Sequence, residues 1–178
     1  MEYVLIIKNL FIIYIKRLLK KGNWKFQSWQ NIHHTVKMTT CENSFIFFGL
    51  HNTIERYGNI YVGKNAELIL GNKNYFNQGL IMSCQSKVVV GNNCLFGPNV
   101  TVIDNNHKFY KNIGVSFELN KAPIEIGNNC WIGANVIILK GAKIGNNCVI
   151  SANSVVTGII SDNSIFKQDR STIIEKMR

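Results

Sequence analysis

The sequence predicts an all-β chain folded as a parallel β-helix, on three observations. Aliphatic residues recur at every sixth position late in the chain, turn-forming triplets separate them, and the composition is that of a chain with a core. The recurring residues are Ile126, Ile132, Ile138, Ile144, Ile150 and Val156. An α-helix repeats every 3.6 residues and a strand every two, so a period of six indicates neither. Each unit of six instead supplies one short strand and one turn, and three units close a triangular coil.

The turns and the small residues of this run also fit a stack of coils. Gly-Asn-Asn triplets stand at 91–93, 127–129 and 145–147. Gly and Asn tolerate positive φ, so we expect these triplets at the corners. Cys94, Cys130 and Cys148 share one position of the six-residue unit. We interpret them as small inward core residues rather than reactive thiols.

The same period occurs earlier in shorter blocks, which set the predicted boundaries. The blocks are Leu70, Phe76 and Met82, then Val90, Phe96 and Val102, with a weaker trace at Phe48, Ile54 and Ile60. The phase slips by two residues between the first two blocks. We therefore predict the β-helix over 60–160, a degenerate first coil or cap over 27–59, and a C-terminal tail over 161–178.

One segment interrupts the repeat. Val102 ends one block and Ile126 resumes the phase, and the polar stretch between them predicts an expelled loop over 104–121. Loops held on a regular scaffold tend to carry function. This loop holds His107, the only histidine after residue 51.

Residues 1–26 form a basic arm with apolar residues at helical spacing. Six basic residues stand there against Glu2, namely Lys8, Lys16, Arg17, Lys20, Lys21 and Lys25. Lys8 interrupts the apolar run, which is then too short to span a bilayer at about 20 residues. Two interpretations remain open. The arm is a helix packed on the body or a neighbouring subunit, or an amphipathic helix on an anionic inner membrane surface. We expect a cytoplasmic protein, peripheral to that membrane in the second case.

Charge and cysteine usage exclude other classes. Half of the net charge of +10 lies in the arm, whereas a nucleic-acid-binding domain spreads Lys and Arg along one face. No nucleic-acid partner is expected. The five cysteines include no CxxC pair, so a zinc ribbon or redox dithiol is not expected, and free thiols suit a reducing compartment.

Over residues 60–160 the chain resembles the left-handed β-helix acyltransferases with hexapeptide repeats. The most similar branch is the maltose/galactoside O-acetyltransferase-like group, which includes capsule and O-antigen O-acetyltransferases. Four segments carry the resemblance: YFNQG, GPNVTVIDNNH, APIEIGNNCWIGANVIILKGAKIG and ISANSVVTG. It implies a left-handed triangular prism, a homotrimer with sites between subunits, and acetyl-CoA as co-substrate without a metal.

The resemblance also implies roles for particular residues. His107 takes the place of the general base, Asn77 that of the acceptor-holding asparagine, and Trp131 that of the tryptophan lining the donor cleft. The positions facing the pantetheine arm are Ala134, Ala152 and Thr157. Lys167 and Arg170 could meet the nucleotide phosphates as cations, or belong to a solvated tail. The implied reaction is direct acetyl transfer to a saccharide hydroxyl in surface polysaccharide biosynthesis, with His107 taking the hydroxyl proton.

The chain departs from the family pattern in ways that keep alternatives open. Cys84 stands where the family often has Asp, and a nucleophilic role for it is the less favoured interpretation. The family's G-x-P-A-K segment after the last coil is missing. Two other functions therefore stay open, a non-catalytic trimeric scaffold or binding subunit and an antibiotic acetyltransferase of the same fold.

Overall fold

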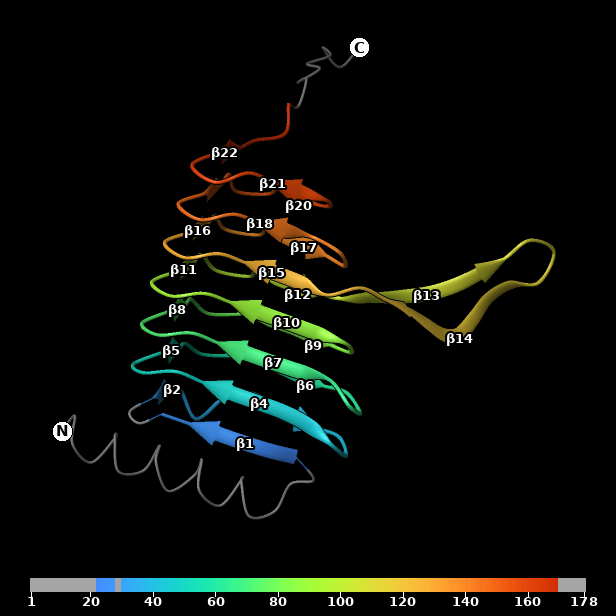
Figure 1. Cartoon of the computed structure of the whole chain (residues 1–178), viewed down its shortest axis with the longest axis horizontal. Coiled ribbons are helices and arrows are strands. Elements are labelled where there is room, and N and C mark those ends of the chain that lie inside the picture. Colours follow the sequence, from blue (N-terminus) through green and yellow to red (C-terminus); the bar gives the residue numbers. More distant parts are fainter. Residues whose placement is uncertain (1–21, 28–29, 170–178) are drawn as a thin grey trace, which may run out of the picture.

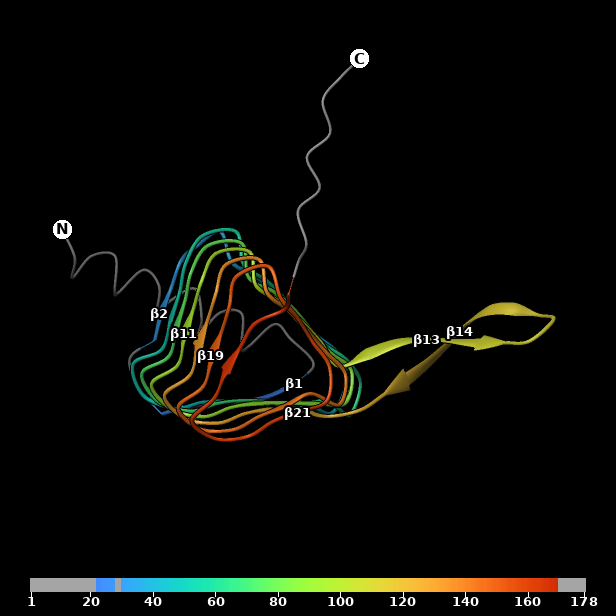
Figure 2. The same cartoon turned by 90° about the horizontal axis from the view of Figure 1, so that it is seen from above.

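The fold is an all-β solenoid in a computed structural model that describes residues 22–27 and 30–169. These residues contain strands and turns and no helix. The strands form three parallel sheets, here called A, B and C, and one separate hairpin. Each complete coil contributes one strand to each sheet in the order A, B, C, and the last coil contributes β21 and β22 to sheets A and B; Figure 2 shows the triangular cross-section that results.

The strands of each sheet stack one coil above another, as Figure 1 shows. Sheet A contains β1 (Gly22–Phe26), β4 (Ser44–Phe48), β7 (Glu67–Leu70), β10 (Lys87–Val90), β15 (Ile124–Ile126), β18 (Lys143–Ile144) and β21 (Ile159–Ile160). Sheet B contains β2 (Asn31–Ile32), β5 (Thr53–Ile54), β8 (Tyr75–Phe76), β11 (Leu95–Phe96), β16 (Trp131–Ile132), β19 (Val149–Ile150) and β22 (Ile165–Phe166). Sheet C contains β3 (Lys37–Thr40), β6 (Asn59–Val62), β9 (Ile81–Cys84), β12 (Thr101–Ile103), β17 (Ile137–Leu139) and β20 (Val155–Val156). The hairpin consists of β13 (Asn105–Tyr110) and β14 (Gly114–Lys121).

The period of six arises because one inward residue of each strand stacks on its equivalents above and below. Ile126 lies in register with Val90 and Ile144, and all three are buried. The predicted inward aliphatic residues are buried in every block, and Phe76 stacks on Phe96 with ring centroids 4.5 Å apart. The parallel β-helix is confirmed, and the stack of about six coils is consistent with the left-handed prism that the resemblance implies.

The slip of two residues in the repeat is a change in coil length. Equivalent residues are 22 apart in the first coils, then 20, and 18 where the repeat is regular. The extra residues lie in the turn from sheet C to sheet A, for example Gln85 and Ser86 between β9 and β10. Because two residues are added, side chains keep their inward and outward alternation.

The Gly-Asn-Asn triplets lie at the turn from sheet A to sheet B, where each residue has a separate task. The second asparagine has positive φ, as Asn93, Asn129 and Asn147 show. The first asparagine accepts a backbone N–H from the coil below, since Asn128 Oδ1 lies 2.8 Å from Asn92 N. The glycine does not have positive φ, contrary to expectation. A Cβ on Gly91 would lie 2.7 Å from the carbonyl oxygen of Gly127, so close approach of the coils requires it.

The solenoid is longer than predicted. The described strands run from β1 to β22, so coils occupy residues before 60 and after 160. Residues 22–26, assigned to the arm, form β1 and pair with β4. The first coils lack the Gly-Asn-Asn signal but keep buried Ile46 and Phe48. The predicted amphipathic helix lies in residues 1–21, outside the described part. Within that part, the structure contains no helix with the length and apolar character needed to cross a bilayer.

Candidate functional site

The expelled loop is a β-hairpin that leaves the prism at one edge. It connects β12 in sheet C to β15 in sheet A, and we call this edge, marked by the turns that follow β9, β12 and β20, the C–A edge. Figure 2 shows the hairpin pointing away from the solenoid. Its large apolar side chains are exposed, with Phe117 at 98% and Ile113 at 80%. Such an apolar surface on an extended arm is typical of a contact with another molecule.

His107 lies on β13 with its ring fixed by one hydrogen bond. Its Nδ1 is 2.9 Å from the carbonyl oxygen of Ser116 on β14. A carbonyl only accepts, so in the neutral ring Nδ1 carries the proton and Nε2 keeps the free lone pair. His107, Val115, Ser116 and Phe117 line a shallow hollow of about 150 Å³. The arrangement presents a proton acceptor beside an apolar surface.

An ion pair on the same hairpin stiffens it next to His107. Lys108 Nζ lies 2.7 Å from Glu118 Oε2, and the hydroxyl of Tyr110 lies 3.3 Å from the same oxygen. The hydrogen bond and charge of Lys108 lower the pKa of Glu118, and Glu118 raises the pKa of Lys108. Both charges are exposed, so the pair adds little to the free energy of unfolding, and we infer that it orders the two hairpin strands locally.

A second predicted group gathers on another edge. Asn77 follows β8, Ala134 follows β16 and Ala152 follows β19, so all three lie in turns from sheet B to sheet C, here called the B–C edge. Asn99, Asn135 and Asn153 stack beside them, joined by side-chain hydrogen bonds of 3.2 Å. Ala134 and Ala152 keep the side chains small at their two turns.

Trp131 lies on the outer face of sheet B near the B–C edge group. It is 57% exposed and stands in register between Leu95, 53% exposed, and Val149. These three outward side chains form an apolar strip. Leu95 lies in the coil from which the hairpin leaves, and Trp131 and Val149 lie in the next two coils. An exposed indole beside small residues suits contact with a flat or extended ligand.

The remaining predicted donor-binding residues lie elsewhere. Thr157 follows β20 at the C–A edge, two coils above the hairpin. Lys167 is exposed after β22, and Arg170 lies outside the described residues. Within one chain, then, the structure does not bring the predicted site together. His107 and Thr157 share the C–A edge, whereas Asn77, Ala134 and Ala152 share the B–C edge.

Asp104 is a residue of this region that the sequence analysis did not single out. It lies at the base of the hairpin with no exposed surface. Its carboxylate accepts the backbone N–H groups of Gln85 and Ser86 at 2.7 and 2.6 Å. The available signal was an acidic residue directly after the last buried aliphatic strand before the loop.

Cys84 is placed where a nucleophile would not work. Its side chain is buried and its thiol donates to the carbonyl of Glu67 at 3.2 Å. Burial raises the pKa of Cys84 to about 12, with a further contribution from the charge of Asp104. A thiol attacks as the thiolate, so this environment makes Cys84 inert. Cys94, Cys130 and Cys148 are likewise buried, as expected.

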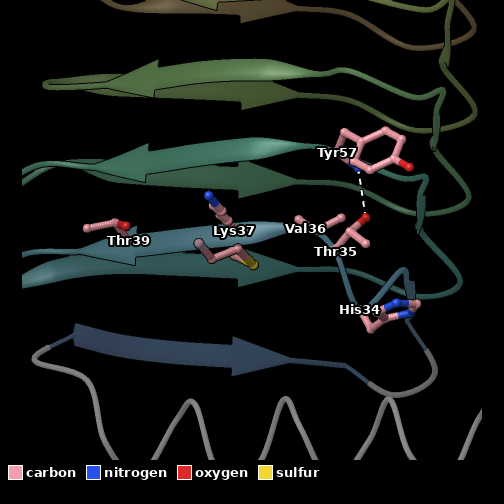
Figure 3. Close-up of a pocket in the computed structure, with 7 residues that line it drawn as sticks. His34, Thr35, Val36, Lys37, Thr39 and Tyr57 are labelled. Carbon is pink, nitrogen blue, oxygen red and sulfur yellow. Dashed lines mark hydrogen bonds between the residues drawn. The ribbon is translucent and has the colours of Figure 1, made fainter.

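Among the histidines outside the predicted site, His33 holds a turn through its ring. His33 Nδ1 lies 2.9 Å from Thr35 Oγ1. The same Thr35 oxygen accepts the backbone N–H of Tyr57 at 2.9 Å, as Figure 3 shows. Burial, followed by the charges of His34 and Arg56, lowers the pKa of His33. The neighbouring hollow of about 590 Å³ is larger than that at His107. It is open and none of the residues expected to act in catalysis or donor binding lines it, so we give it less weight.

Comparison with known proteins agrees with this architecture. Residues 123–158 match the model described as bacterial transferase hexapeptide (six repeats). No curated protein matches the chain. Among solved structures, a hexapeptide-repeat acetyltransferase from Vibrio cholerae O1 biovar eltor, complexed with acetyl coenzyme A, shares 20% identity at a TM-score of 0.56. That match covers 86% of this chain and 69% of the other.

Two further structures share the fold. The polySia-specific acetyltransferase NeuO matches at 16% identity and a TM-score of 0.57, over 88% of this chain and 78% of its own. A mutant of the N-acyltransferase AntD from Bacillus cereus, in complex with dTDP and coenzyme A, matches at 15% identity and a TM-score of 0.56. It covers 84% of this chain and 82% of the other. The chain therefore contains bacterial transferase hexapeptide repeats over residues 123–158, and it shares its β-helix fold with acyltransferases.

The environment of Cys84 gives a testable expectation. Because its pKa of about 12 keeps the thiol protonated at pH 8, iodoacetamide should leave Cys84 unmodified in the folded protein and alkylate it in denaturant. The half-buried Cys41 serves as the internal comparison. Mass spectrometry of tryptic peptides measures both. Alkylation of native Cys84 at the rate of Cys41 would contradict the assignment and restore it as a nucleophile.

Proposed function

We propose that the protein is an acetyl-CoA-dependent O-acetyltransferase that acts on a saccharide hydroxyl. The observation that carries the proposal is His107, held on an expelled hairpin with Nδ1 donating to Ser116 and Nε2 free to accept a proton. A core or scaffold role needs no histidine in that position. The acyltransferases that share the fold support the reaction class, and the complexes with acetyl coenzyme A and with coenzyme A support the donor.

The proposed reaction is a direct transfer. Nε2 of His107 takes the proton of the acceptor hydroxyl as its oxygen attacks the acetyl carbonyl carbon of the thioester. The tetrahedral intermediate collapses, the carbon–sulfur bond breaks, and the departing sulfur of coenzyme A receives the proton from His107. A backbone N–H in the cleft stabilises the oxyanion. The inert thiol of Cys84 favours this route over a covalent acyl-cysteine.

The separation of the two edges leads us to propose a homotrimer with the site between subunits. The hairpin of one copy would place His107 against the B–C edge of the next, where Asn77 holds the acceptor and Trp131, Ala134 and Ala152 meet the donor. Each copy uses two different edges, so the contact is head-to-tail, and in the proposed trimer the rotation between copies closes the ring. The exposed Phe117 and Ile113 supply apolar surface for that contact.

A surface polysaccharide is the acceptor that we propose. The resemblance to capsule and O-antigen O-acetyltransferases supports it, as does the shared fold of the polySia-specific acetyltransferase NeuO. An exposed hairpin suits a long acceptor better than an enclosed pocket, because a polymer must enter and leave sideways. An antibiotic is the alternative acceptor, as in the antibiotic acetyltransferases of the same fold. A screen of saccharides and antibiotics as acceptors separates the two functions.

Replacing the proposed base tests the reaction. The substitution His107→Ala should lower kcat by about 10²- to 10⁴-fold, the usual contribution of a general base, and leave the binding of acetyl-CoA unchanged. Release of coenzyme A in the presence of saccharide acceptors gives the rate. His51→Asn is the matched control, since Asn tolerates the φ of 56° at that position. Full activity in His107→Ala would refute the mechanism.

The trimer is tested through the hairpin. Phe117→Asp should convert a trimer of three 20.2 kDa chains to monomers and abolish transfer, because the charge replaces a side chain expected to be buried between copies. Analytical ultracentrifugation measures the mass. Leu50→Asp, at the edge between sheets A and B, carries the same charge change without loss of the trimer. A wild-type monomer that is active would contradict the proposed assembly.

A further inference from the structure

Asp104 is the one acidic side chain buried in the described part of the chain, and it occupies a special place in the stack. It follows β12, at the point where the hairpin leaves the solenoid. The register of β9 with β12 pairs Ser83 with Ile103, so Asp104 is the equivalent of Cys84 one coil below. A buried carboxylate is costly unless it accepts hydrogen bonds, and its partners therefore indicate its role.

The partners of Asp104 result from the departure of the hairpin. In the coil below, the backbone carbonyl of Cys84 accepts the N–H of Gly63 at 2.8 Å, as the regular stack requires. The backbone carbonyl of Asp104 would accept the N–H of Gln85 in the same way. It instead accepts the N–H of Ala122 at 3.0 Å, which closes the base of the hairpin. The carboxylate of Asp104 takes over, accepting Gln85 N and Ser86 N at 2.7 and 2.6 Å.

The same side chain is tied to the first hairpin strand. The amide Nδ2 of Asn105 donates to Asp104 Oδ1 at 3.1 Å and to Ser83 Oγ at 3.2 Å. Asn105 pairs with Lys121 across the hairpin and stands two residues before His107. The carboxylate therefore fixes the base of both hairpin strands on the rigid coil below.

We propose that Asp104 is a positioning residue for His107, which sets the direction in which the hairpin leaves the prism and so presents the imidazole to the acceptor. The expected effect of Asp104 on kcat rests on the proposed function, in which His107 is the base. Asp104 touches neither substrate nor His107, and it acts through the hairpin base. A change away from the chemistry that misplaces the reacting group by about 1 Å costs on the order of 100-fold in rate, so anchoring of the hairpin at this point matters.

The test compares Asp104→Asn with Asp162→Asn as its matched control. Asp162 also accepts a backbone N–H, that of Asn146 at 2.9 Å, but at the edge between sheets A and B, where no hairpin leaves. Two readouts are needed, hydrogen exchange of residues 105–121 against β15 to β17, and kcat separately from the KM for acetyl-CoA. Asn105→Ala is the second variant, because it loosens the hairpin base while the buried acceptors stay intact.

For Asp104→Asn we expect about tenfold faster exchange in the hairpin with unchanged exchange in β15 to β17. We also expect kcat about ten- to 100-fold lower with KM for acetyl-CoA within about twofold. Asn105→Ala should also speed hydrogen exchange in the hairpin and lower kcat, but by smaller factors. Asp162→Asn should change neither quantity. Unchanged hairpin exchange overturns the proposal, as does equally fast exchange in the coils, which would mean a merely structural role. If the wild type transfers no acetyl group, the proposed function fails and the exchange comparison alone decides.

Discussion

The constraint on which this structure depends is that the backbone N–H groups buried between two coils need acceptors, which the neighbouring coil supplies along each sheet. Along the three faces, the backbone carbonyls of the neighbouring parallel strand are the acceptors, and these hydrogen bonds run from coil to coil. At the turns from sheet A to sheet B, the acceptors are the side-chain oxygens of Asn92, Asn128 and Asn146. Buried N–H groups are almost always paired in native proteins, so a coil that breaks the stack must supply a replacement.

The hairpin is the place where the stack is broken, and the function that we propose starts there. The coil that carries it has 36 residues between equivalent positions, against 18 in the regular part. The Asp104 carboxylate replaces the acceptor that Gln85 N loses when the hairpin leaves. The strands β13 and β14 can then extend into solvent with His107 exposed. A rigid prism with one anchored arm holds a base in a fixed direction without enclosing it. That geometry suits an acceptor bound between copies of the chain.

Much of this architecture was predictable from the sequence, because the repeat is a direct consequence of stacking. The period of six predicted the inward Ile132 and Ile138, and its interruption predicted the loop that holds His107. The first coils were harder, since β1 to β3 keep buried residues but lack the Gly-Asn-Asn turns. The position of Asp104 directly after a buried strand was visible in the sequence, but its role was not. That role exists because the Asp104 backbone carbonyl bonds to Ala122, so the N–H of Gln85 needs the carboxylate as its acceptor. Likewise, no local pattern tells which edge of a second copy faces Asn77.

Binding of acetyl-CoA, measured by isothermal titration calorimetry, tests the central claim most directly because it needs no knowledge of the acceptor. We expect one site per chain in the wild type and loss of binding in Trp131→Arg, where a cation replaces the exposed indole on sheet B. Leu50→Asp, on the remaining edge, should bind as the wild type does. No binding by the wild type at millimolar acetyl-CoA would contradict the account and favour a non-catalytic β-helix.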